Sequence, residues 1–216
     1  SEFEMLNDYA SSRLGMHDLM PWDISFVAQK IKEERYSFKD EDLRQHFPLR
    51  KVMSGLFDLL GSLYGISVVD QSTTAWDPNV QLLAVNNRAG NLIGYFYMDL
   101  FARDGKRPGA WMDDAIGRWK TERHTQLPVA YLVCNFPSQG AAASDAYLSH
   151  GEVETLFHEC GHVMHHLMTK IDEVGISGIN GVEWDAVELP SQFMENFCWD
   201  WEIIKKISSD DSGQCH

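Results

Sequence analysis

The 216-residue sequence has few of the features that mark a membrane, secreted or nucleic-acid-binding protein. No apolar run approaches the roughly 18 to 20 residues that cross a bilayer, so we expect no membrane segment. Lysine and arginine number 18 against 32 aspartates and glutamates, which gives a net charge of -14. Because affinity for nucleic acid depends on clustered cations, this balance predicts no nucleic-acid partner and favours cationic peptides or metal ions.

Cysteine is also scarce, and the four residues form no CxxC pair: Cys134, Cys160, Cys198 and Cys215. This spacing excludes a zinc knuckle and a dense disulfide framework. The sequence has neither an Asn-x-Ser/Thr acceptor nor a charged-then-apolar leader, so we predict a cytoplasmic location, or an organelle matrix in a eukaryote. Ser1 stands where an initiating Met is usual, so we expect an excerpt of a longer protein.

What is present is the composition of a folded globular chain, with 44% hydrophobic and 23% charged residues. Apolar positions at helical spacing predict a helix over 23–36 and a second, amphipathic helix that starts at Leu49 and is closed by Gly65. A short polar helix over 40–47 is expected between them. The sequence therefore predicts a helical N-terminal part over 6–69.

The middle of the chain, over 70–136, has the pattern of a sheet. Residues 80–88 and 92–103 are rich in β-branched and aromatic residues and flank a Gly-containing turn, which predicts a β-hairpin. The nearly all-apolar stretch 128–136 predicts an interior strand. The segment 106–126 is expected to be loop or an irregular edge strand, and 138–144 a surface loop.

The last part, over 150–207, returns to helical periodicity. Apolar residues recur at i, i+3, i+4 and i+7 over 151–169, and a second apolar helical stretch runs over 182–206. Pro190 should kink or divide that second helix, because it removes a main-chain hydrogen bond. We therefore predict an α+β fold, mainly α, in which a small, mostly antiparallel sheet backs two helices within one partial domain.

The first of these late helices contains His158-Glu159-Cys160-Gly161-His162. Residues i and i+4 share a helix face about 5 to 6 Å apart, so both imidazoles can reach one zinc ion. Glu159 lies beside them and is placed to take a proton from a metal-bound water. The alternative reading is a helix that carries two histidines by chance.

A third ligand is expected from the second late helix, where Glu183, Glu188 and Glu195 are all available. We favour Glu188, which lies at the expected Pro190 kink in an almost wholly apolar stretch. A carboxylate buried in apolar surroundings needs a cation. An ordinary salt bridge of Glu188 is the alternative.

The segments HECGHVMHHLMT and GISGINGVEWDAVELPSQFMENF resemble the metal-binding core of the oligopeptidase A and thimet oligopeptidase family of zinc peptidases. The resemblance extends through GYFYMDLFARDGKRPGAWMDD and PVAYLVCNF and covers most of the chain. It implies a zincin-like core in which His158, His162 and Glu188 bind zinc, Glu159 is the general base, and short peptides are the substrates. The chain departs from the family at Cys160, where a bulky Phe is usual.

The same resemblance implies that part of the machinery lies outside this chain. Family members are longer, mostly helical, and have a deep channel between two lobes. Their substrate-binding His and Tyr residues lie well downstream of the ELPSQ segment. We therefore expect the isolated chain to be a poor or inactive peptidase, and to self-associate through an exposed face around Trp199 and Trp201.

Weaker signals surround the motif. Gly175, Gly178 and Gly181 form a loop that the resemblance places near the substrate; a phosphate-binding loop would follow a strand, so no nucleotide site is expected. Asp185 is a candidate to orient a zinc-bound imidazole through its other nitrogen.

His165 and His166 extend the histidine face, but a third histidine would crowd a tetrahedral site, so we expect them to be supporting or solvated groups. An exposed sheet edge, where a peptide could add as a strand, is expected to include Leu100, Ala102, Ala110 and Met112. Ordinary sheet packing is an equal alternative for any one of these four residues.

We interpret the chain as the catalytic core of a zinc-dependent endopeptidase that hydrolyses short peptides. One alternative is a zinc-binding fragment that is catalytically silent. Another is a hydrolase of the deformylase kind with a cysteine as third ligand, for which Cys134 is the only upstream thiol.

Overall fold

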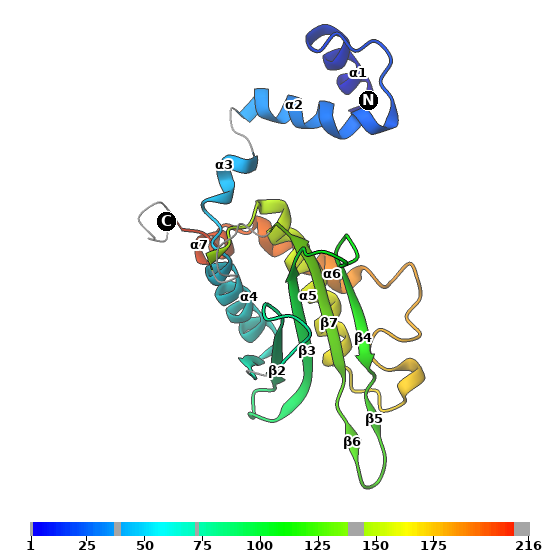
Figure 1. Ribbon diagram of the computed structural model, residues 1–216. Helices are drawn as coiled ribbons and strands as arrows, with labels where there is room; N and C mark the ends of the chain where they lie inside the picture. Colours follow the sequence, from blue (N-terminus) through cyan, green and yellow to red (C-terminus); the bar gives the residue numbers. More distant parts are fainter. Residues whose placement is uncertain (1, 37–39, 72–73, 138–144, 210–216) are drawn as a thin grey trace. The chain divides into compact units, whose positions relative to one another are not determined.

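The computed structural model describes residues 2–36, 40–71, 74–137 and 145–209 (Figure 1). The loop expected over 138–144 and Cys215 lie outside the described residues. The chain divides into two compact units, a smaller one up to Leu43 and a larger one from Arg44 onward. The single partial domain expected from the sequence stays a prediction.

The smaller unit is built from two helices, α1 (Glu2–Arg13) and α2 (Ile24–Tyr36), with the 3-10 turn η1 (Pro21–Asp23) leading into α2. Ala10 and Val27 are its buried apolar side chains. The Tyr9 hydroxyl donates to the Glu34 carboxylate at 2.6 Å and joins the two helices. The helix predicted over 23–36 is confirmed, and the short α3 (Asp40–Arg44) follows it.

The larger unit opens with the amphipathic helix α4 (Leu49–Tyr64). The helix ends as predicted at Gly65, whose φ of 67° is left-handed and favours glycine. The chain then enters β1 (Ser67–Asp70) directly. The sheet therefore begins at Ser67, a few residues before the expected range of 70–136.

The sheet has five strands in the order β1-β2-β3-β7-β4. β2 (Gln81–Asn86) and β3 (Leu92–Phe101) form the predicted hairpin, and β7 (Val129–Phe136) is the predicted interior strand. β3 and β7 pair in parallel, and the other three pairs are antiparallel. The fold is therefore α+β with a small mixed sheet.

The segment 106–126 is more regular than expected. It contains β4 (Trp111–Ile116), which pairs with β7 at the edge of the sheet, and a small ribbon of β5 (Trp119–Lys120) and β6 (Thr125–Gln126). The expectation that Leu100 belongs to an exposed sheet edge is wrong, because Leu100 is 3% exposed and β3 is an interior strand of the sheet.

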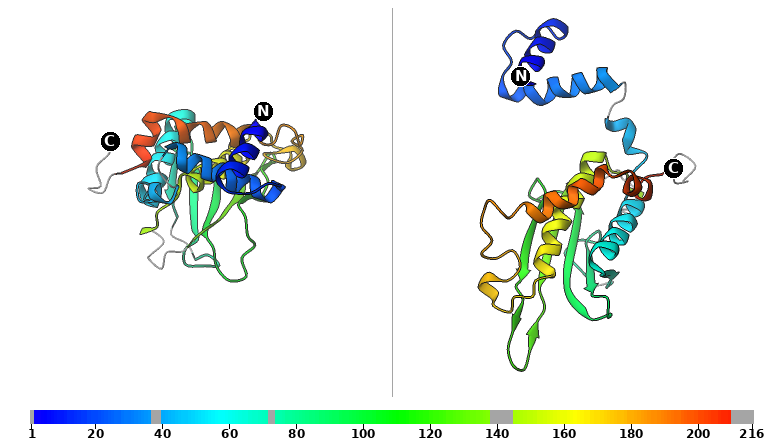
Figure 2. Two further views of the ribbon diagram at one scale, coloured as in Figure 1. Left: turned by 90° about the horizontal axis from the view of Figure 1, so that it is seen from above. Right: turned by 180° about the vertical axis from the view of Figure 1, so that it is seen from behind.

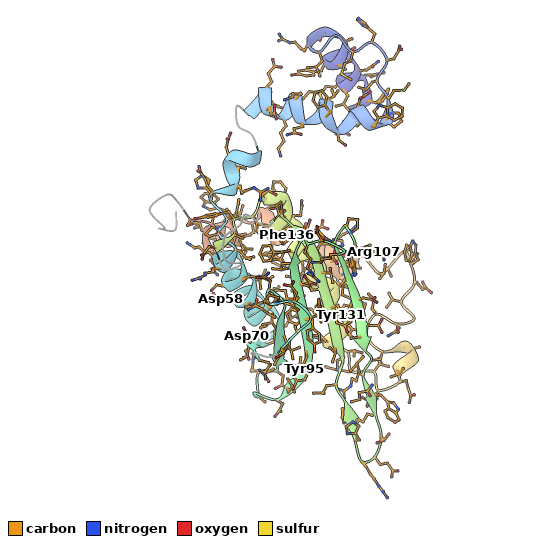
Figure 3. All side chains as sticks on the ribbon, viewed as in Figure 1. Asp58, Asp70, Tyr95, Arg107, Tyr131 and Phe136 are labelled. Atoms are coloured by element: carbon orange, nitrogen blue, oxygen red, sulfur yellow. The ribbon has the colours of Figure 1, made fainter. Side chains whose placement is uncertain are left out.

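Helices α4 and α5 (His150–Leu167) cover the same face of the sheet, as the view from behind in Figure 2 shows. Figure 3 draws the side chains on the ribbon. The buried apolar side chains include residues of the sheet and of the helices, among them Phe96, Met98, Leu132, Leu156 and Phe157. None of the described helices is both long and apolar enough to cross a bilayer.

The second late helix begins later than the apolar pattern suggests. Residues 184–188 form turns, and α6 covers only Leu189–Glu195. The segment is completed by η4 (Asn196–Trp199) and α7 (Trp201–Ile207). Pro190 therefore lies in the first turn of α6 and does not kink a longer helix. Proline is tolerated there because its missing N–H would have no intrahelical partner.

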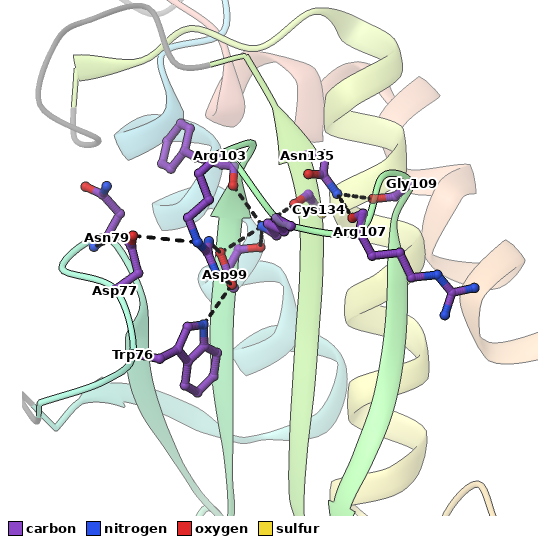
Figure 4. A network of polar contacts seen from close by, with 11 residues as sticks. Trp76, Asp77, Asn79, Asp99, Arg103, Arg107, Gly109, Cys134 and Asn135 are labelled. Atoms are coloured by element: carbon purple, nitrogen blue, oxygen red, sulfur yellow. Dashed lines mark hydrogen bonds and ion pairs between the residues drawn. The ribbon is translucent and has the colours of Figure 1, made fainter.

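A buried ion cluster ties the ends of the parallel strands to the connection that leads into β4 (Figure 4). Lys106 Nζ lies 2.8 Å from the Asp99 carboxylate and donates to the carbonyl oxygens of Phe101 and Cys134, at 2.8 and 2.5 Å. Arg103 contacts the same carboxylate through two nitrogens, at 2.7 and 2.8 Å. The cluster therefore fixes the start of the connection that leads from β3 to the edge strand β4.

Candidate metal centre

The two histidines of the motif come from the middle of α5. The helix begins at a capping box in which the Ser149 hydroxyl accepts from the Glu152 N–H, and the motif lies two turns further on. The rings of His158 and His162 lie on one helix face with their centroids 4.9 Å apart. The predicted i, i+4 arrangement is therefore present.

Glu188 completes a cluster with these histidines. Its Oε2 lies 3.3 Å from His158 Nε2 and 3.1 Å from His162 Nε2, and one ligand atom from each of the three residues lies within 4.8 Å of the others. The expectation that Glu188 is buried is wrong, because its side chain is 49% exposed. It is the residue just before α6, and not a position inside a buried helix.

Gly161 explains how α6 comes close enough to α5 to deliver Glu188. A Cβ at this position would lie 2.5 Å from the Pro190 carbonyl oxygen and 2.7 Å from Ser191 Cα, distances that real Cβ atoms do not show. The absence of a side chain at the fourth residue of the motif therefore permits the two main chains to touch. The sequence contains this glycine, but nothing in its spacing says which segment approaches it.

Hydrogen bonding and burial set the charge states of the ligands. A hydrogen bond from the Ser191 hydroxyl, 2.8 Å from Glu188 Oε2, lowers the pKa of Glu188 and favours its anion. Burial lowers the pKa of His162 and favours the neutral imidazole. A carboxylate and neutral imidazoles are the forms that bind a metal ion.

The donor set and its spacing fit zinc. Two ligand atoms at about 2.0 to 2.1 Å from a tetrahedral zinc ion lie about 3.3 to 3.4 Å apart. The Nε2–Oε2 distances of 3.3 and 3.1 Å are close to that value. Two histidines and a glutamate are also a ligand set of catalytic zinc sites that keep a fourth position open.

Glu159 lies beside the cluster and is 5% exposed. Burial raises the pKa of Glu159 to about 7, against the opposing effects of His158 and of a backbone hydrogen bond from Met112 in β4. Its Oε2 is buried and has no hydrogen-bond partner among the described residues. Next to the cluster there is a cavity of about 370 Å³, lined by Glu154, Thr155, His158, Glu159 and Glu195.

The second ring nitrogens of the histidines differ in their surroundings. His158 Nδ1 lies 2.5 Å from Glu195 Oε1, whereas His162 Nδ1 is buried without a partner in the described part of the chain. Asp185, the expected orienting carboxylate, is exposed, and the described contacts include none between it and either histidine. From the sequence, Glu195 is predicted only as a possible third ligand, and its contact with His158 Nδ1 is not predicted.

The glycine loop is fastened to the sheet through His166. This fully buried histidine lies with Nε2 3.0 Å from the Ile116 carbonyl oxygen, and its Nδ1 accepts from the Ile179 N–H at 3.4 Å. Gly178, with φ of 65°, lies against the His166 ring, where a Cβ would lie 2.3 Å from Nδ1. Gly181 is also left-handed, with φ of 74°. Unlike His166, His165 keeps a buried Nδ1 without a partner among the described residues.

Comparison with known proteins places the chain among peptidases. Residues 1–215 match Peptidase family M3. The chain is 46% identical over 209 residues to oligopeptidase A of Escherichia coli, a match that covers 96% of the chain and 31% of that protein. It is 42% identical over 195 residues to the organellar oligopeptidase A, chloroplastic/mitochondrial, of Arabidopsis thaliana, covering 87% of the chain and 24% of the relative. Saccharolysin of Saccharomyces cerevisiae is 30% identical over 197 residues, with 87% and 28% covered. The chain thus spans about a third or less of these relatives.

Proposed function

The chain belongs to peptidase family M3, and from that premise we propose that it is the zincin-like catalytic core of a zinc-dependent oligopeptidase that hydrolyses short peptides. The observation that carries the proposal is the cluster of His158, His162 and Glu188 with Glu159 beside it. The cytoplasmic location expected from the sequence stays a prediction.

Each residue has a distinct role in this proposal. His158, His162 and Glu188 would hold the zinc ion, which would supply Lewis-acid chemistry at the scissile peptide group. Glu159 does not bind the metal. Its unpartnered carboxylate oxygen accepts the proton of the water that attacks the peptide carbonyl, and then donates it to the leaving amine nitrogen.

The alternative with a cysteine ligand is not supported by the geometry. Cys134 is fully buried in β7, its thiol has a pKa raised well above the ordinary value by burial, and it is not a member of the cluster. A metal-binding thiol is deprotonated and reaches the ion directly. The silent-fragment alternative is an outcome of the activity test below.

Zinc stoichiometry tests the ligands. We expect one equivalent of zinc per chain after dialysis, and loss of that zinc in Glu188→Ala. Glu183→Ala is the matched control, because Glu183 is an exposed glutamate of the preceding turn and lies outside the cluster. Full zinc retention by Glu188→Ala, together with loss in Glu183→Ala, would show that the third ligand is misassigned.

Peptide hydrolysis tests Glu159. In a chain extended to the length of the relatives, Glu159→Gln should keep its zinc and lose about 10²- to 10⁴-fold in turnover of a quenched fluorescent peptide. Unchanged turnover would remove Glu159 from the reaction. If the extended wild-type chain binds zinc and hydrolyses no peptide, the alternative of a zinc-binding but catalytically silent protein is correct.

A further inference from the structure

The inner face of α6 and the residue before it carry more than one polar group directed at α5. Glu188, Ser191 and Glu195 are spaced i, i+3 and i+7, which places them on one face of a helix. Glu188 reaches both imidazoles, Ser191 contacts Glu188, and Glu195 contacts His158 on the other side of its ring. We propose that Glu195 is a positioning residue that holds His158 with the lone pair of Nε2 directed at the metal.

The atoms in contact determine the direction of the hydrogen bond. An ionised carboxylate only accepts hydrogen bonds, so in the 2.5 Å contact His158 Nδ1 donates to Glu195 Oε1. A neutral imidazole with its proton on Nδ1 has its lone pair on Nε2. Nε2 is the atom that faces Glu188 Oε2 at 3.3 Å. Without a metal ion, Glu188 can accept a proton from Nε2 in the same way, so the two carboxylates compete for the imidazole. Once a metal ion occupies Nε2, Glu195 is the remaining acceptor and holds the Nδ1 proton.

The same contact fixes the plane of the ring. The side chain of His158 is 26% exposed, whereas that of His162 is 9% exposed and is held by packing. Among the described residues, His162 Nδ1 has no partner. The more exposed ligand thus has the orienting hydrogen bond, and its loss should affect His158 and leave His162 in place.

Glu195 can take this role because it stays on the outer side of the ring. Its contact is with Nδ1, while both contacts of Glu188 are with Nε2 atoms. The proposal rests on the proposed metal site, but it makes a separate statement about His158. Removal of an outer hydrogen-bond partner of a ligating histidine lowers metal affinity by about 10- to 100-fold.

The experiment compares Glu195→Ala, Glu195→Gln and Glu154→Ala in the 216-residue chain. Glu154→Ala is the matched control, because Glu154 lines the same cavity and its replacement removes the same negative charge. The described contact of Glu154 is with the indole N–H of Trp199 at 3.1 Å. Zinc affinity is measured by competition with a chromophoric chelator. We expect a 10- to 100-fold loss in Glu195→Ala, and a loss of less than about fivefold in Glu195→Gln, whose amide oxygen still accepts from Nδ1.

A second measurement reads the Nδ1 hydrogen bond in the zinc-loaded chain, without peptide. Two-dimensional ¹⁵N–¹H spectra of the imidazoles, with His158 assigned through His158→Asn, should show a His158 Nδ1 proton that exchanges slowly with water in wild type, Glu154→Ala and Glu195→Gln. In Glu195→Ala, loaded to the same zinc occupancy, this proton should exchange too fast to be observed. If this variant keeps the slowly exchanging Nδ1 proton and wild-type zinc affinity, or if Glu154→Ala weakens zinc equally, the proposal is wrong.

The outcomes separate this proposal from the proposed function. A chain with the expected Nδ1 proton exchange and zinc affinities that shows no peptidase activity when extended would refute the function and leave the role of Glu195 intact. Peptide hydrolysis by an extended chain whose Glu195→Ala variant has unchanged zinc affinity and Nδ1 proton exchange would support the function and refute the role of Glu195.

Discussion

Gly161→Ala should separate the stability of the fold from the integrity of the metal site. The new Cβ would lie 2.5 Å from the Pro190 carbonyl oxygen, 2.7 Å from Ser191 Cα and 2.9 Å from the Pro190 carbonyl carbon. All three atoms belong to the main chain, so no flexible side chain can move aside. To restore a contact of 3.0 to 3.4 Å from 2.5 Å, the start of α6 must retreat by 0.5 to 0.9 Å.

This retreat has opposite consequences for the helix and for the site. Overpacking destabilises by about 1 to 3 kcal/mol, whereas alanine is better than glycine inside a helix by about 1 kcal/mol. We therefore expect a net loss of stability of at most about 2 kcal/mol. Glu188 precedes Pro190 by two residues and moves with it. Its Oε2 would leave the 3.1 and 3.3 Å contacts with the imidazoles, and zinc affinity should fall tenfold or more.

The assay pairs urea unfolding of the metal-free chain with zinc competition against a chelator. Gly151→Ala is the control, because Gly151 is in the same helix and a Cβ there has nothing within 4 Å. It should leave zinc affinity unchanged and raise stability by up to about 1 kcal/mol. Wild-type zinc affinity in Gly161→Ala would show that zinc binding does not depend on the close contact between α5 and α6.

Three further perturbations have definite expected outcomes. Burial raises the pKa of Glu159 from 4.5 to about 7, so the metal-free wild type loses stability as the pH rises through 7. Glu159→Gln should therefore raise the Tm more at pH 8 than at pH 4.5. Equal increases in Tm at the two pH values would refute this. Burial raises the pKa of Asp99, but hydrogen bonds from its basic neighbours outweigh this and hold its pKa below the ordinary value, so its stabilisation is present above about pH 4 and is lost as the pH falls through that lower pKa. Lys106→Met should therefore destabilise by about 1.5 to 3 kcal/mol in urea at pH 7, because one charged hydrogen-bond donor is lost while Arg103 still pairs with Asp99, and by less once the pH falls below that pKa. No measurable loss at pH 7 would contradict the cluster's role. Trp199 and Trp201 are 65% and 62% exposed, so we expect the wild-type chain to self-associate in sedimentation and the joint replacement of both residues by serine to lower this association. An unchanged distribution would exclude this face.

The parts of the fold that the sequence predicts are those that depend on local periodicity. α4 with its terminating Gly65, the hairpin of β2 and β3, and the apolar stripe of α5 each follow from residues close together in the chain. The i, i+4 spacing of His158 and His162 is of the same kind. These features could be predicted because the helix or strand period alone decides which side chains share a face.

The features that could not be predicted depend on contacts between distant segments. The parallel pairing of β3 with β7 joins strands separated by 27 residues, and their alternation does not say in which direction they pair. The late start of α6 is not predicted, because the apolar residues within 184–188 share the helical pattern but form turns. Pro190 was the signal for that start, since proline is favoured in the first turn of a helix.

The same distinction applies to the cluster of His158, His162 and Glu188, which the sequence predicts, and to the contact of Glu195 with His158, which it does not. A ligand must be a histidine, cysteine or carboxylate, so residue type and spacing narrow the candidates to Glu183, Glu188 and Glu195. Which of these binds, and which orients, depends on the angle at which α6 meets α5. That angle is set by the contact at Gly161, where the main chain of α6 occupies the place of a side chain. With α6 held there, Glu188 faces the Nε2 atoms and Glu195, seven residues later on the same face, meets His158 from the Nδ1 side. The division of roles between two similar glutamates is therefore a property of helix packing, and it becomes visible only when both helices are in place.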